Sequence, residues 1–276
     1  MTDRQPYSLG ASESELARLD AQAASIAAPT ALFLKSAGIA PGMRALDLGT
    51  GLGHVAFQLS ELVGPAGAVV GVDQATPMLA VAEQRRAAAD IENVRFVEAD
   101  AHTFRDHETF DAVVGRLILF HLPDPVEVLR HHVGGLAEDG LILMIDFDVG
   151  SARSEPPVPL FHAARDWVIE AFRRAGANPM IGTQLGLLLH DAGLTDIQTF
   201  GIQSYLTPDD AAGPALLSSV VNSLAPMIIA SGIATEEELA LDSLQERLTR
   251  ELQTSRAIGL IPAVAGAWGR RRASLK

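Results

Sequence analysis

The sequence predicts an α/β fold built on a doubly wound, mostly parallel, seven-stranded sheet, with N-terminal cap helices and a helical lid inserted before the last strand. Three observations lead to this prediction. Short apolar segments alternate with segments of helical periodicity between Met43 and Phe147. A glycine-rich turn joins the first of these strands to its helix. Farther along the chain, the long helical pattern of 208–255 separates two strand-like segments.

The length and composition of the chain fit one large core with an added subdomain. The chain has 276 residues, of which 48% are hydrophobic and 20% charged, and a chain of this size can bury one extensive core. We expect an N-terminal helical cap over 1–40 and an α/β core over 41–206. A helical lid over 207–256 then precedes the last core strand and a basic tail over 257–276.

Each element up to Phe147 follows from its local pattern. Residues 13–37 have apolar side chains at helical spacing, and Pro41-Gly42 interrupts the chain after them. A buried strand, 44–48, runs directly into the glycines, and a helix, 54–63, follows. Short apolar strands separated by helices imply a parallel sheet covered on both faces. The further strands are 68–72, 94–98, 110–115 and 140–147, and the further helices are 77–89 and 125–136.

The pattern changes after Asp148. A proline-rich stretch leads into the predicted helices 161–175 and 183–192 and the strand 196–206. Residues 208–255 have a helical pattern that we expect to be interrupted near Pro226 and Gly232, and 260–268 is the last predicted strand. A helical insertion between two strands of a hairpin connection is typical of a segment that covers a site.

The charge of the chain argues against nucleic acid as a partner. Its 34 acidic and 21 basic side chains give a formal net charge of −13, which repels a phosphate backbone. The one dense basic cluster, Arg270-Arg271-Arg272, lies at the end of the chain without interleaved aromatic residues. We therefore expect a small-molecule partner and no nucleic acid, and the sequence leaves a homodimer open.

The sequence contains no cysteine, which excludes disulfides, thiolate metal sites and thiol nucleophiles. This composition fits a reducing compartment. The N-terminus lacks the apolar core of a signal peptide, and no stretch reaches the roughly 18 uninterrupted apolar residues of a membrane span. We expect a cytoplasmic protein with no membrane partner.

The glycine-rich turn is the first candidate binding element. In open α/β sheets, ligands bind beyond the carboxyl ends of the strands, and Gly49, Gly51 and Gly53 follow the first strand. Glycines allow positive φ and let a ligand approach backbone groups at a helix N-terminus. Where a dinucleotide fingerprint needs its third glycine, this chain has His54. Asp47, two residues before the first glycine, places a carboxylate that suits an ammonium better than a pyrophosphate.

The next two strands also end in acidic residues. Asp73 ends the second strand, where a carboxylate can accept hydrogen bonds from both ribose hydroxyls. Asp100 follows the third strand as an acceptor for an exocyclic adenine amine, beside the small residue Ala101. By itself, Asp73 is equally well explained as a helix N-cap, and Asp47 as a turn-stabilising residue.

The chain resembles the class I S-adenosylmethionine-dependent methyltransferases, and most of all the branch that includes quinone-biosynthesis and natural-product enzymes of secondary metabolism. The resemblance implies the Rossmann-like methyltransferase fold and S-adenosylmethionine as cofactor. After about Phe147 it is no longer informative. The stretches that carry it are Ala45-Leu-Asp-Leu-Gly-Thr-Gly-Leu-Gly53, Val69-Val-Gly-Val-Asp73, Met78-Leu79, Asn93-Val-Arg-Phe-Val-Glu-Ala-Asp100, Phe110-Asp-Ala-Val-Val-Gly-Arg116, Leu119-Phe-His-Leu-Pro-Asp-Pro125 and Gly140-Leu-Ile-Leu-Met-Ile145.

The resemblance also implies a set of cofactor-binding residues. Asp47 and the glycine loop with Thr50 contact the methionine end, Arg116 lies near it at the tip of the fourth strand, and Asp73 holds the ribose. The N-terminal cover over the cofactor corresponds to Tyr7 and Gln22, and a disordered terminus is an equal alternative for Tyr7. The full set is Tyr7, Gln22, Asp47, Gly49, Thr50, Gly51, Gly53, Asp73, Gln74, Met78, Asp100, Ala101 and Arg116.

Two residues are candidates for acid–base chemistry. Methyl transfer from a sulfonium is an in-line displacement that needs a base only when the acceptor loses a proton. His121 follows the fourth strand, and Asp148 follows the fifth, two residues after Asp146. A turn-stabilising role for His121 is the main alternative. We expect no metal site, because no third or fourth oxygen ligand accompanies the two aspartates, and we expect the pair His131-His132 on a solvated helix face.

The resulting function is transfer of a methyl group to an O, N or C atom of a small, apolar metabolite. A protein that binds S-adenosylmethionine without transferring methyl, as a partner subunit or a non-methylating catalyst, is the first alternative. An NAD(P)-dependent oxidoreductase shares the fold, but His54 and Asp100 argue against it. A nucleic-acid methyltransferase is disfavoured because Gly115-Arg116-Leu117-Ile118 replaces the motif that clamps a flipped base.

Overall fold

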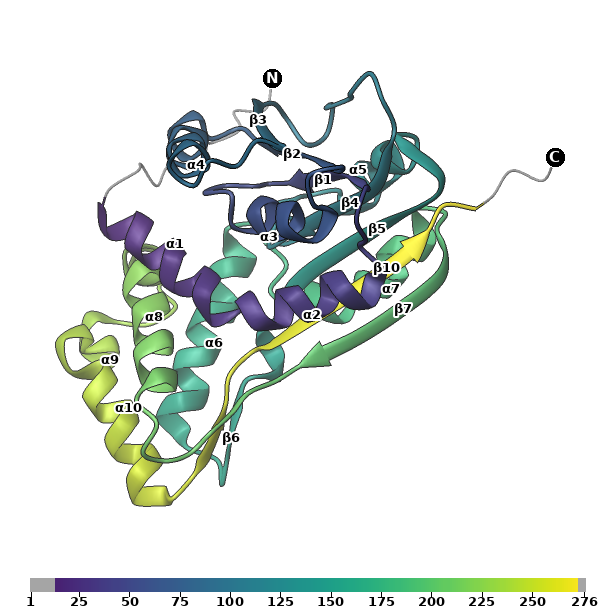
Figure 1. Cartoon of the computed structure of the whole chain (residues 1–276). Helices are drawn as coiled ribbons and strands as arrows, with labels where there is room; N and C mark the ends of the chain where they lie inside the picture. The colour runs from purple at the N-terminus through teal and green to yellow at the C-terminus, as the bar shows by residue number, and fades with distance from the viewer. Residues whose placement is uncertain (1–12, 273–276) are drawn as a thin grey trace.

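The computed structural model describes residues 13–272 and is organised around one seven-stranded sheet (Figure 1). The strand order is β3-β2-β1-β4-β5-β10-β7, so that the order reverses between β1 and β4. All strands are parallel except β10, which pairs antiparallel with both neighbours. The strands are β1 (Arg44–Leu48), β2 (Ala68–Asp73), β3 (Val94–Glu98), β4 (Phe110–Arg116), β5 (Leu136–Asp148), β7 (Thr195–Ile202) and β10 (Ala263–Arg270). The predicted doubly wound, mostly parallel sheet is confirmed.

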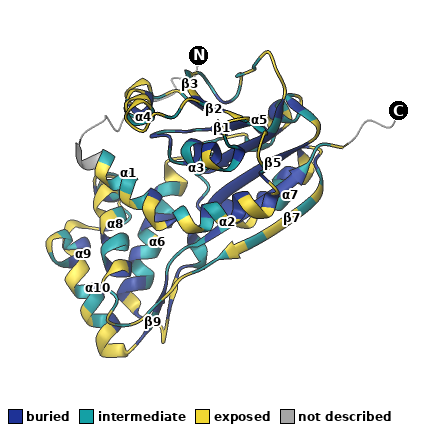
Figure 2. Ribbon diagram, in the orientation of Figure 1, coloured by how far each residue is buried: buried dark blue, intermediate teal, exposed yellow. Residues whose placement is uncertain are grey.

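Helices cover both faces of this sheet. On one face, α2 and α3 bury Phe33, Leu34 and Leu59 against residues such as Ala45 and Val114. On the other face, α5 and α7 pack over a second apolar cluster, while α4 packs along the edge strand β3. Because both faces are covered, the central strands are buried nearly throughout (Figure 2). These helices are α2 (Ala27–Ala37), α3 (His54–Val63), α4 (Thr76–Ala88), α5 (Pro125–Val133) and α7 (Leu185–Asp191).

A second lobe of helices packs beside the carboxyl ends of the strands (Figure 1). α6 and α10 pack against α8 around a third apolar cluster, and the cap helix α1 (Glu13–Ser25) leads into α2. A small antiparallel sheet, in the order β6-β9-β8, joins this lobe to the main sheet. The lobe contains α6 (Pro159–Arg174), α8 (Ala212–Ala230), α9 (Glu236–Leu239), α10 (Leu241–Ser255), β6 (Arg153–Glu155), β8 (Tyr205–Leu206) and β9 (Ile258–Leu260).

The small sheet was not predicted, and it divides two predicted strands. The predicted strand 196–206 is two strands, because the Gln203 side chain donates hydrogen bonds to the carbonyls of Ser151 (3.0 Å) and Ile261 (2.9 Å) and turns the chain toward β9. The predicted strand 260–268 is likewise divided between β9 and β10 at Ile261-Pro262. Proline lacks the N–H that a continuous ladder requires.

Two predicted helix boundaries are wrong. The helix after β4 ends at Val133, because Gly134 and Gly135 follow it and Leu136 already pairs with Phe110 in the sheet. The predicted break near Pro226 is absent, since α8 continues through it. Pro226 is exposed on the solvent side of α8, where water can satisfy the carbonyl that loses its partner. α8 instead ends at Ala230, close to Gly232, whose φ of 65° closes the turn.

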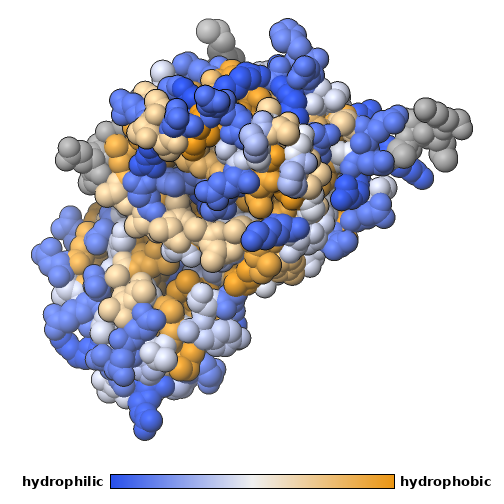
Figure 3. Space-filling model, viewed as in Figure 1, coloured by the Kyte–Doolittle hydropathy of each residue, from blue (hydrophilic) through white to orange (hydrophobic). Residues whose placement is uncertain are grey.

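Helix α8 also bears on the expectation that no segment could span a membrane. It has 19 residues and a mean hydropathy of 1.5, which by length and composition alone is enough to cross a bilayer. One such helix is weak evidence, because core helices meet the same criterion, and 33% of its most apolar window is buried against the lobe. Figure 3 shows apolar side chains among polar ones over this part of the molecule.

The contact between α2 and the sheet gives a prediction about stability. The Phe33 ring lies directly over Gly266 of β10, where an added Cβ would overlap the ring atoms, and the ring packs 4.5 Å from that of Phe200. We expect Gly266→Ala to lower the free energy of unfolding by about 1–3 kcal/mol, the usual result of overpacking a core. Thermal denaturation measures this loss. Gly201→Ala is the matched control, because its Cβ would have only the Val264 carbonyl nearby, at 3.7 Å, and equal melting temperatures would contradict the prediction.

Candidate active site

The glycine turn lies between the carboxyl end of β1 and the start of α3. Gly49, Gly51 and Gly53 have φ values of 66°, 50° and 83°, in the left-handed region that favours glycine. Gly53 is the N-cap of α3, so the helix begins at His54. A Cβ on Gly51 would meet no described atom within 4 Å. The turn therefore leaves open space at Gly51, where a ligand can approach the helix N-terminus, while Gly49 and Gly53 allow close packing against Ile118 and Phe57.

Asp47 lies beneath this turn and is almost completely buried, at 1% exposure. The Thr50 hydroxyl donates a hydrogen bond of 2.6 Å to Asp47 Oδ2. Burial raises the pKa of Asp47 to about 7, although the Thr50 hydrogen bond and the charge of Arg116 oppose that shift. A buried carboxyl group whose pKa lies near 7 is a common feature of functional sites.

Asp73 joins the tip of β2 to the glycine turn. Its Oδ2 accepts a hydrogen bond of 2.8 Å from Gly51 N–H, and its Oδ1 accepts one of 2.9 Å from Ala75 N–H. Asp73 thus fixes the glycine turn and the chain that leads to α4, but it is not the helix N-cap, because the N-cap of α4 is Ala75. Each carboxylate oxygen can accept a second hydrogen bond, and capacity remains for two ligand hydroxyls.

The loop after β3 carries Asp100 and Ala101 at the neighbouring strand tip. Asp100 Oδ1 accepts hydrogen bonds of 2.8 Å from the backbone N–H of His102 and lies 2.8 Å from the His102 ring Nδ1. Ala101 is 8% exposed, and Met78 on α4 is 5% exposed, whereas Gln74 is exposed between β2 and α4.

Arg116 is a half-buried cation at the tip of β4. Its Nη1 donates a hydrogen bond of 3.1 Å to the Thr30 hydroxyl of α2, and that hydroxyl in turn donates to the Ile26 carbonyl at 2.7 Å. Burial lowers the pKa of Arg116, while the nearby Asp47 raises it. A half-buried guanidinium that donates to one neutral hydroxyl among the described residues retains donors for a carboxylate.

The cap helix α1 is tied to the core across this site. Asp20 accepts hydrogen bonds of 2.9 Å from both Nη atoms of Arg85 on α4, and its Oδ1 lies 2.8 Å from His54 Nε2. Gln22 lies on the same helix and accepts a hydrogen bond of 3.4 Å from Arg18. Tyr7, the other predicted cover residue, lies outside the described residues. The sequence did not reveal the Asp20–Arg85 pair, because 65 positions separate its members and neither belongs to a motif.

The two candidate proton acceptors lie after neighbouring strands. His121 ends a 3₁₀ turn after β4, and its ring packs edge-on against Phe120, 4.8 Å between centroids. The residue is exposed, but the surrounding protein lowers the pKa of His121 by desolvation. Asp148 ends β5, and burial raises its pKa. Its Oδ1 is buried and has no hydrogen-bond partner among the described residues.

Asp146 holds the turn that carries His121. It is 1% exposed, and its carboxylate accepts hydrogen bonds from the N–H groups of Phe120 (3.2 Å) and Phe147 (3.1 Å). Burial raises the pKa of Asp146 to about 7. Asp146 and Asp148 do not form a metal site with other side chains, since residues 13–272 contain no cluster of three histidines or carboxylates able to hold a metal ion.

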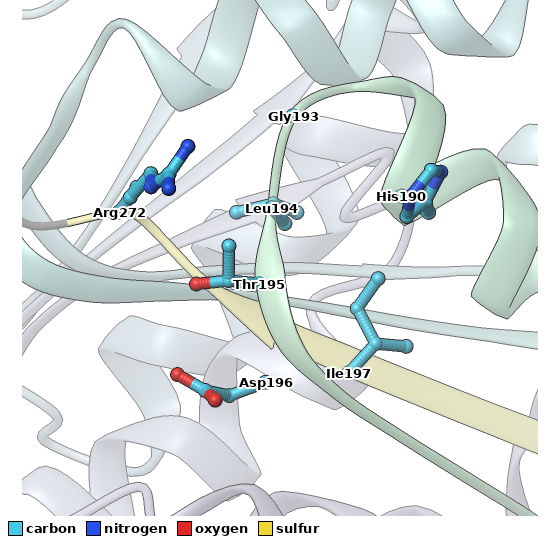
Figure 4. Close-up of a pocket in the computed structure, with 7 residues that line it drawn as sticks. All are labelled: His190, Gly193, Leu194, Thr195, Asp196, Ile197 and Arg272. Atoms are coloured by element: carbon cyan, nitrogen blue, oxygen red, sulfur yellow. The ribbon is translucent and has the colours of Figure 1, made fainter.

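A separate surface depression lies at the other end of the sheet (Figure 4). It is formed where α7 ends and β7 begins, and His190 and Arg272 lie on opposite sides of it. Because β7 is parallel to the central strands, this depression lies at their amino ends. It is therefore far from the glycine turn, and its charged groups do not converge on one point.

Comparisons with known proteins match the core of this chain. Residues 39–175 match a family model described as "Methyltransferase domain". The demethylmenaquinone methyltransferase of Shouchella clausii (strain KSM-K16) is 33% identical over 129 residues, which are 46% of this chain and 52% of that protein. The chain thus spans about half the length of the relatives it matches.

Solved structures share the fold across most of the chain. The YcgJ protein of Bacillus subtilis has a TM-score of 0.57 and 20% identity, covering 89% of this chain and 98% of that one. A phosphoethanolamine N-methyltransferase 2 of Haemonchus contortus, solved with phosphomonomethylethanolamine and S-adenosylhomocysteine, has a TM-score of 0.56 and 20% identity over 89% of this chain and 52% of that one. At these identities the likeness establishes the fold.

Proposed function

Because residues 39–175 are a methyltransferase domain of the class I S-adenosylmethionine-dependent type, we propose that this protein transfers the methyl group of S-adenosylmethionine to an O, N or C atom of a small, apolar acceptor. The observation that carries the proposal is the joined arrangement of the first two strand tips. There, Asp73 accepts a hydrogen bond from Gly51 N–H, which joins the carboxylate proposed to bind the ribose to the glycine turn.

The residues at the strand tips match the successive parts of S-adenosylmethionine. Arg116 would bind the methionine carboxylate, and Asp47 would face the ammonium group across the glycine turn. Asp73 would accept hydrogen bonds from the ribose hydroxyls. Asp100 and Ala101 would border the adenine, with Met78 packed on the adenosine. The cap helix α1, tied by Asp20 to Arg85, would cover the site from outside.

The cofactor supplies an electrophilic methyl group on its sulfonium. The chain's own contribution is to orient the acceptor in line with that methyl and to exclude water. His121 and Asp148 are the groups proposed to take a proton from an acceptor that must lose one. Desolvation keeps the His121 ring neutral, because its pKa is lowered, and a neutral ring can accept that proton. The unpartnered Oδ1 of Asp148 offers a second acceptor.

An apolar acceptor fits the lobe that flanks these residues. Phe120, next to His121, packs edge-on against Phe172 of α6, 4.7 Å between ring centroids. α6 in turn packs against α8, whose half-buried side chains include Leu217, Val220 and Leu224. Such surfaces are typical of sites for apolar ligands. We therefore propose that 207–256 is a lid over the acceptor, and the demethylmenaquinone methyltransferases among the relatives support an apolar, quinone-like substrate.

The test is to incubate the protein with S-adenosylmethionine and two kinds of acceptor, a demethylated naphthoquinol and a polar amine such as phosphoethanolamine. Mass spectrometry detects a product heavier by one methylene, and the release of S-adenosylhomocysteine measures turnover. Methylation of the quinol is the expected result. Methylation of the polar amine alone would refute the apolar acceptor. Binding of S-adenosylhomocysteine without transfer to a broad acceptor panel would favour a binding protein that does not transfer methyl.

Asp47 should make cofactor affinity depend on pH. Its pKa is raised to about 7, so the group is neutral below that pH and anionic above it, and the anion attracts the methionine ammonium. We expect the affinity for S-adenosylhomocysteine to rise about tenfold from pH 6 to pH 8, as one coupled proton requires. Titration calorimetry at several pH values measures this rise.

Two controls isolate Asp47 in that measurement. Asp47→Asn cannot ionise and should flatten the profile, and 5′-methylthioadenosine, which has no ammonium group, should bind equally well across the range. For the ligand-free protein, the contribution of Asp47 to the free energy of unfolding depends on pH in the opposite direction, because it decreases as the pH rises. Folding raises the pKa of Asp47 from 3.8 to about 7, so the protonated carboxyl favours the folded state. This contribution to stability is fully present below pH 3.8 and is lost as the pH rises toward 7. A wild-type affinity that does not change with pH would refute the role of Asp47.

A further inference from the structure

The loop that follows β3 is held from behind by the end of α5. This loop, residues 99–105, contains a compact turn in which Thr103 N–H and Phe104 N–H donate to the Asp100 carbonyl at 3.0 and 2.9 Å. On one side the turn carries Asp100 and Ala101. On the other side it meets the last turn of α5, where His131 and His132 are adjacent in sequence.

Both histidines bond to backbone carbonyls of the loop. His132 Nε2 lies 2.7 Å from the Ala101 carbonyl oxygen, and His131 Nε2 lies 2.8 Å from the Phe104 carbonyl oxygen. A carbonyl oxygen accepts hydrogen bonds only, so each Nε2 carries the proton and donates. The two rings pack edge-on, 5.0 Å between centroids. Successive residues of one helix thus hold two carbonyls of one loop.

The environment of His132 keeps this arrangement fixed. The residue is 2% exposed, contrary to the expectation that the pair lies on a solvated face. Burial lowers the pKa of His132 to about 4, and nearby His131, Arg105 and His102 disfavour its charged form further. The ring is therefore neutral near pH 7. Its buried N–H and the buried carbonyl each need a partner, and separating them would leave both unsatisfied.

A third contact lies at the same place. The guanidinium of Arg105 lies close to the backbone of Gly134 and Gly135, which follow α5. A Cβ added to Gly134 would lie 3.1 Å from Nη2, and one added to Gly135 would lie 3.0 Å from Nη1. Cations near a helix C-terminus interact favourably with its dipole. The glycines that end α5 thus allow the loop to seat against the helix end.

We propose that His132, assisted by His131, is a positioning residue that sets the loop bordering the adenine end of the cofactor site. Each histidine bonds to a backbone carbonyl of the loop, so each acts through the loop and not by contact with the ligand. This inference rests on the proposed function, because that function assigns Asp100 and Ala101 to the adenine. It adds a determinant of cofactor affinity on the far side of the loop.

The experiment compares His132→Leu, His132→Gln, His131→Leu and His190→Gln with the wild type. Leucine removes the donor, whereas the Gln Nε2 can restore it near the same position. His190 is exposed on α7 and serves as the control. Calorimetry with S-adenosylhomocysteine and 5′-methylthioadenosine measures affinity, and hydrogen exchange of the ligand-free proteins measures the opening of 99–105.

We expect His132→Leu to raise the Kd of both ligands about tenfold, which is the usual effect of one lost buried hydrogen bond. Both ligands contain adenosine, so both should weaken equally. Exchange should become faster in 99–105 and stay unchanged in the glycine turn. His132→Gln should recover most of the affinity. His131, which is half-buried, should show a smaller loss in the same direction, and His190→Gln none.

Two results would overturn the inference. In the first, the wild type and His132→Leu bind S-adenosylhomocysteine equally well, and hydrogen exchange in 99–105 is the same in both proteins. The other is an equal loss in the leucine and glutamine variants with faster exchange throughout the sheet, because that indicates core packing and not loop positioning. If the wild type fails to bind either ligand, the proposed function fails, and local exchange in 99–105 still decides whether the histidines hold the loop.

Discussion

Asp73→Ala is expected to raise the Kd for S-adenosylhomocysteine by about 100-fold or more and to weaken 5′-methylthioadenosine to the same degree. The carboxylate has two roles. It accepts hydrogen bonds from Gly51 N–H and Ala75 N–H, and it is the proposed acceptor for the ribose hydroxyls. Hydrogen bonds to a charged group contribute about 1.5–3 kcal/mol each. Losing the ribose contacts and the ordered turn together should therefore raise the Kd at least about 100-fold.

Calorimetry with both ligands tests this expectation, and Asp73→Asn refines it. The asparagine has one carbonyl oxygen and one NH₂ group, so it can keep only one of the two backbone hydrogen bonds and should give an intermediate loss. Glu61→Ala, on the exposed side of α3, is the control for a general effect of charge. If Asp73→Ala binds S-adenosylhomocysteine as well as the wild type, the ribose does not lie at the tip of β2.

Much of the core was predictable from the sequence because local pattern and tertiary role coincide there. The run Arg44–Leu48 is short, contains Ala45, Leu46 and Leu48 and is followed by glycines, and in the structure it is the interior strand β1. Asp73 was recognisable because a strand tip is a fixed place in a parallel sheet. The strand order places the predicted acidic tips side by side, since β2 is bonded to both β1 and β3.

The features that were missed depend on partners distant in sequence. Asp20 is an ordinary helix residue until the fold brings it to Arg85 of α4. The pair His131-His132 has the pattern of a polar face, but in the structure His132 is buried against the loop 99–105. Pro226 reads as a helix break because local propensity disfavours it, but packing of α8 against α6 and α10 outweighs that cost. Local pattern has no information about any of these contacts.

Arg116→Met is expected to weaken S-adenosylhomocysteine about 100-fold and to leave 5′-methylthioadenosine within about twofold. A guanidinium can donate two parallel hydrogen bonds to a carboxylate, and at about 1.5–3 kcal/mol for each the loss is about two factors of ten in Kd. Only S-adenosylhomocysteine contains the amino-acid carboxylate. The difference between the two ligands therefore separates Arg116 from Asp73, whose loss affects both.

Although Arg116→Met should lose affinity, we expect its free energy of unfolding to increase or to stay unchanged. Arg116 is a half-buried cation whose side-chain hydrogen bond goes to the neutral hydroxyl of Thr30, and desolvation lowers its pKa. Replacing a desolvated charge with an apolar side chain of similar size is often neutral or stabilising. Arg44→Met is the matched control at the opposite end of the sheet, where Arg44 pairs with Asp106 at 2.7 Å. That change should lower the free energy of unfolding without altering affinity for S-adenosylhomocysteine.

The outcome for the two ligands identifies what Arg116 does. An equal loss for both would mean that Arg116 acts through Thr30, by holding α2 and the cap in place, and not through the carboxylate. No loss for either would place the methionine carboxylate elsewhere. The expected split also bears on Asp47, because Arg116 opposes the rise in the pKa of that carboxyl. In Arg116→Met the pKa of Asp47 should rise further, and the pH at which cofactor affinity increases should move upward with it.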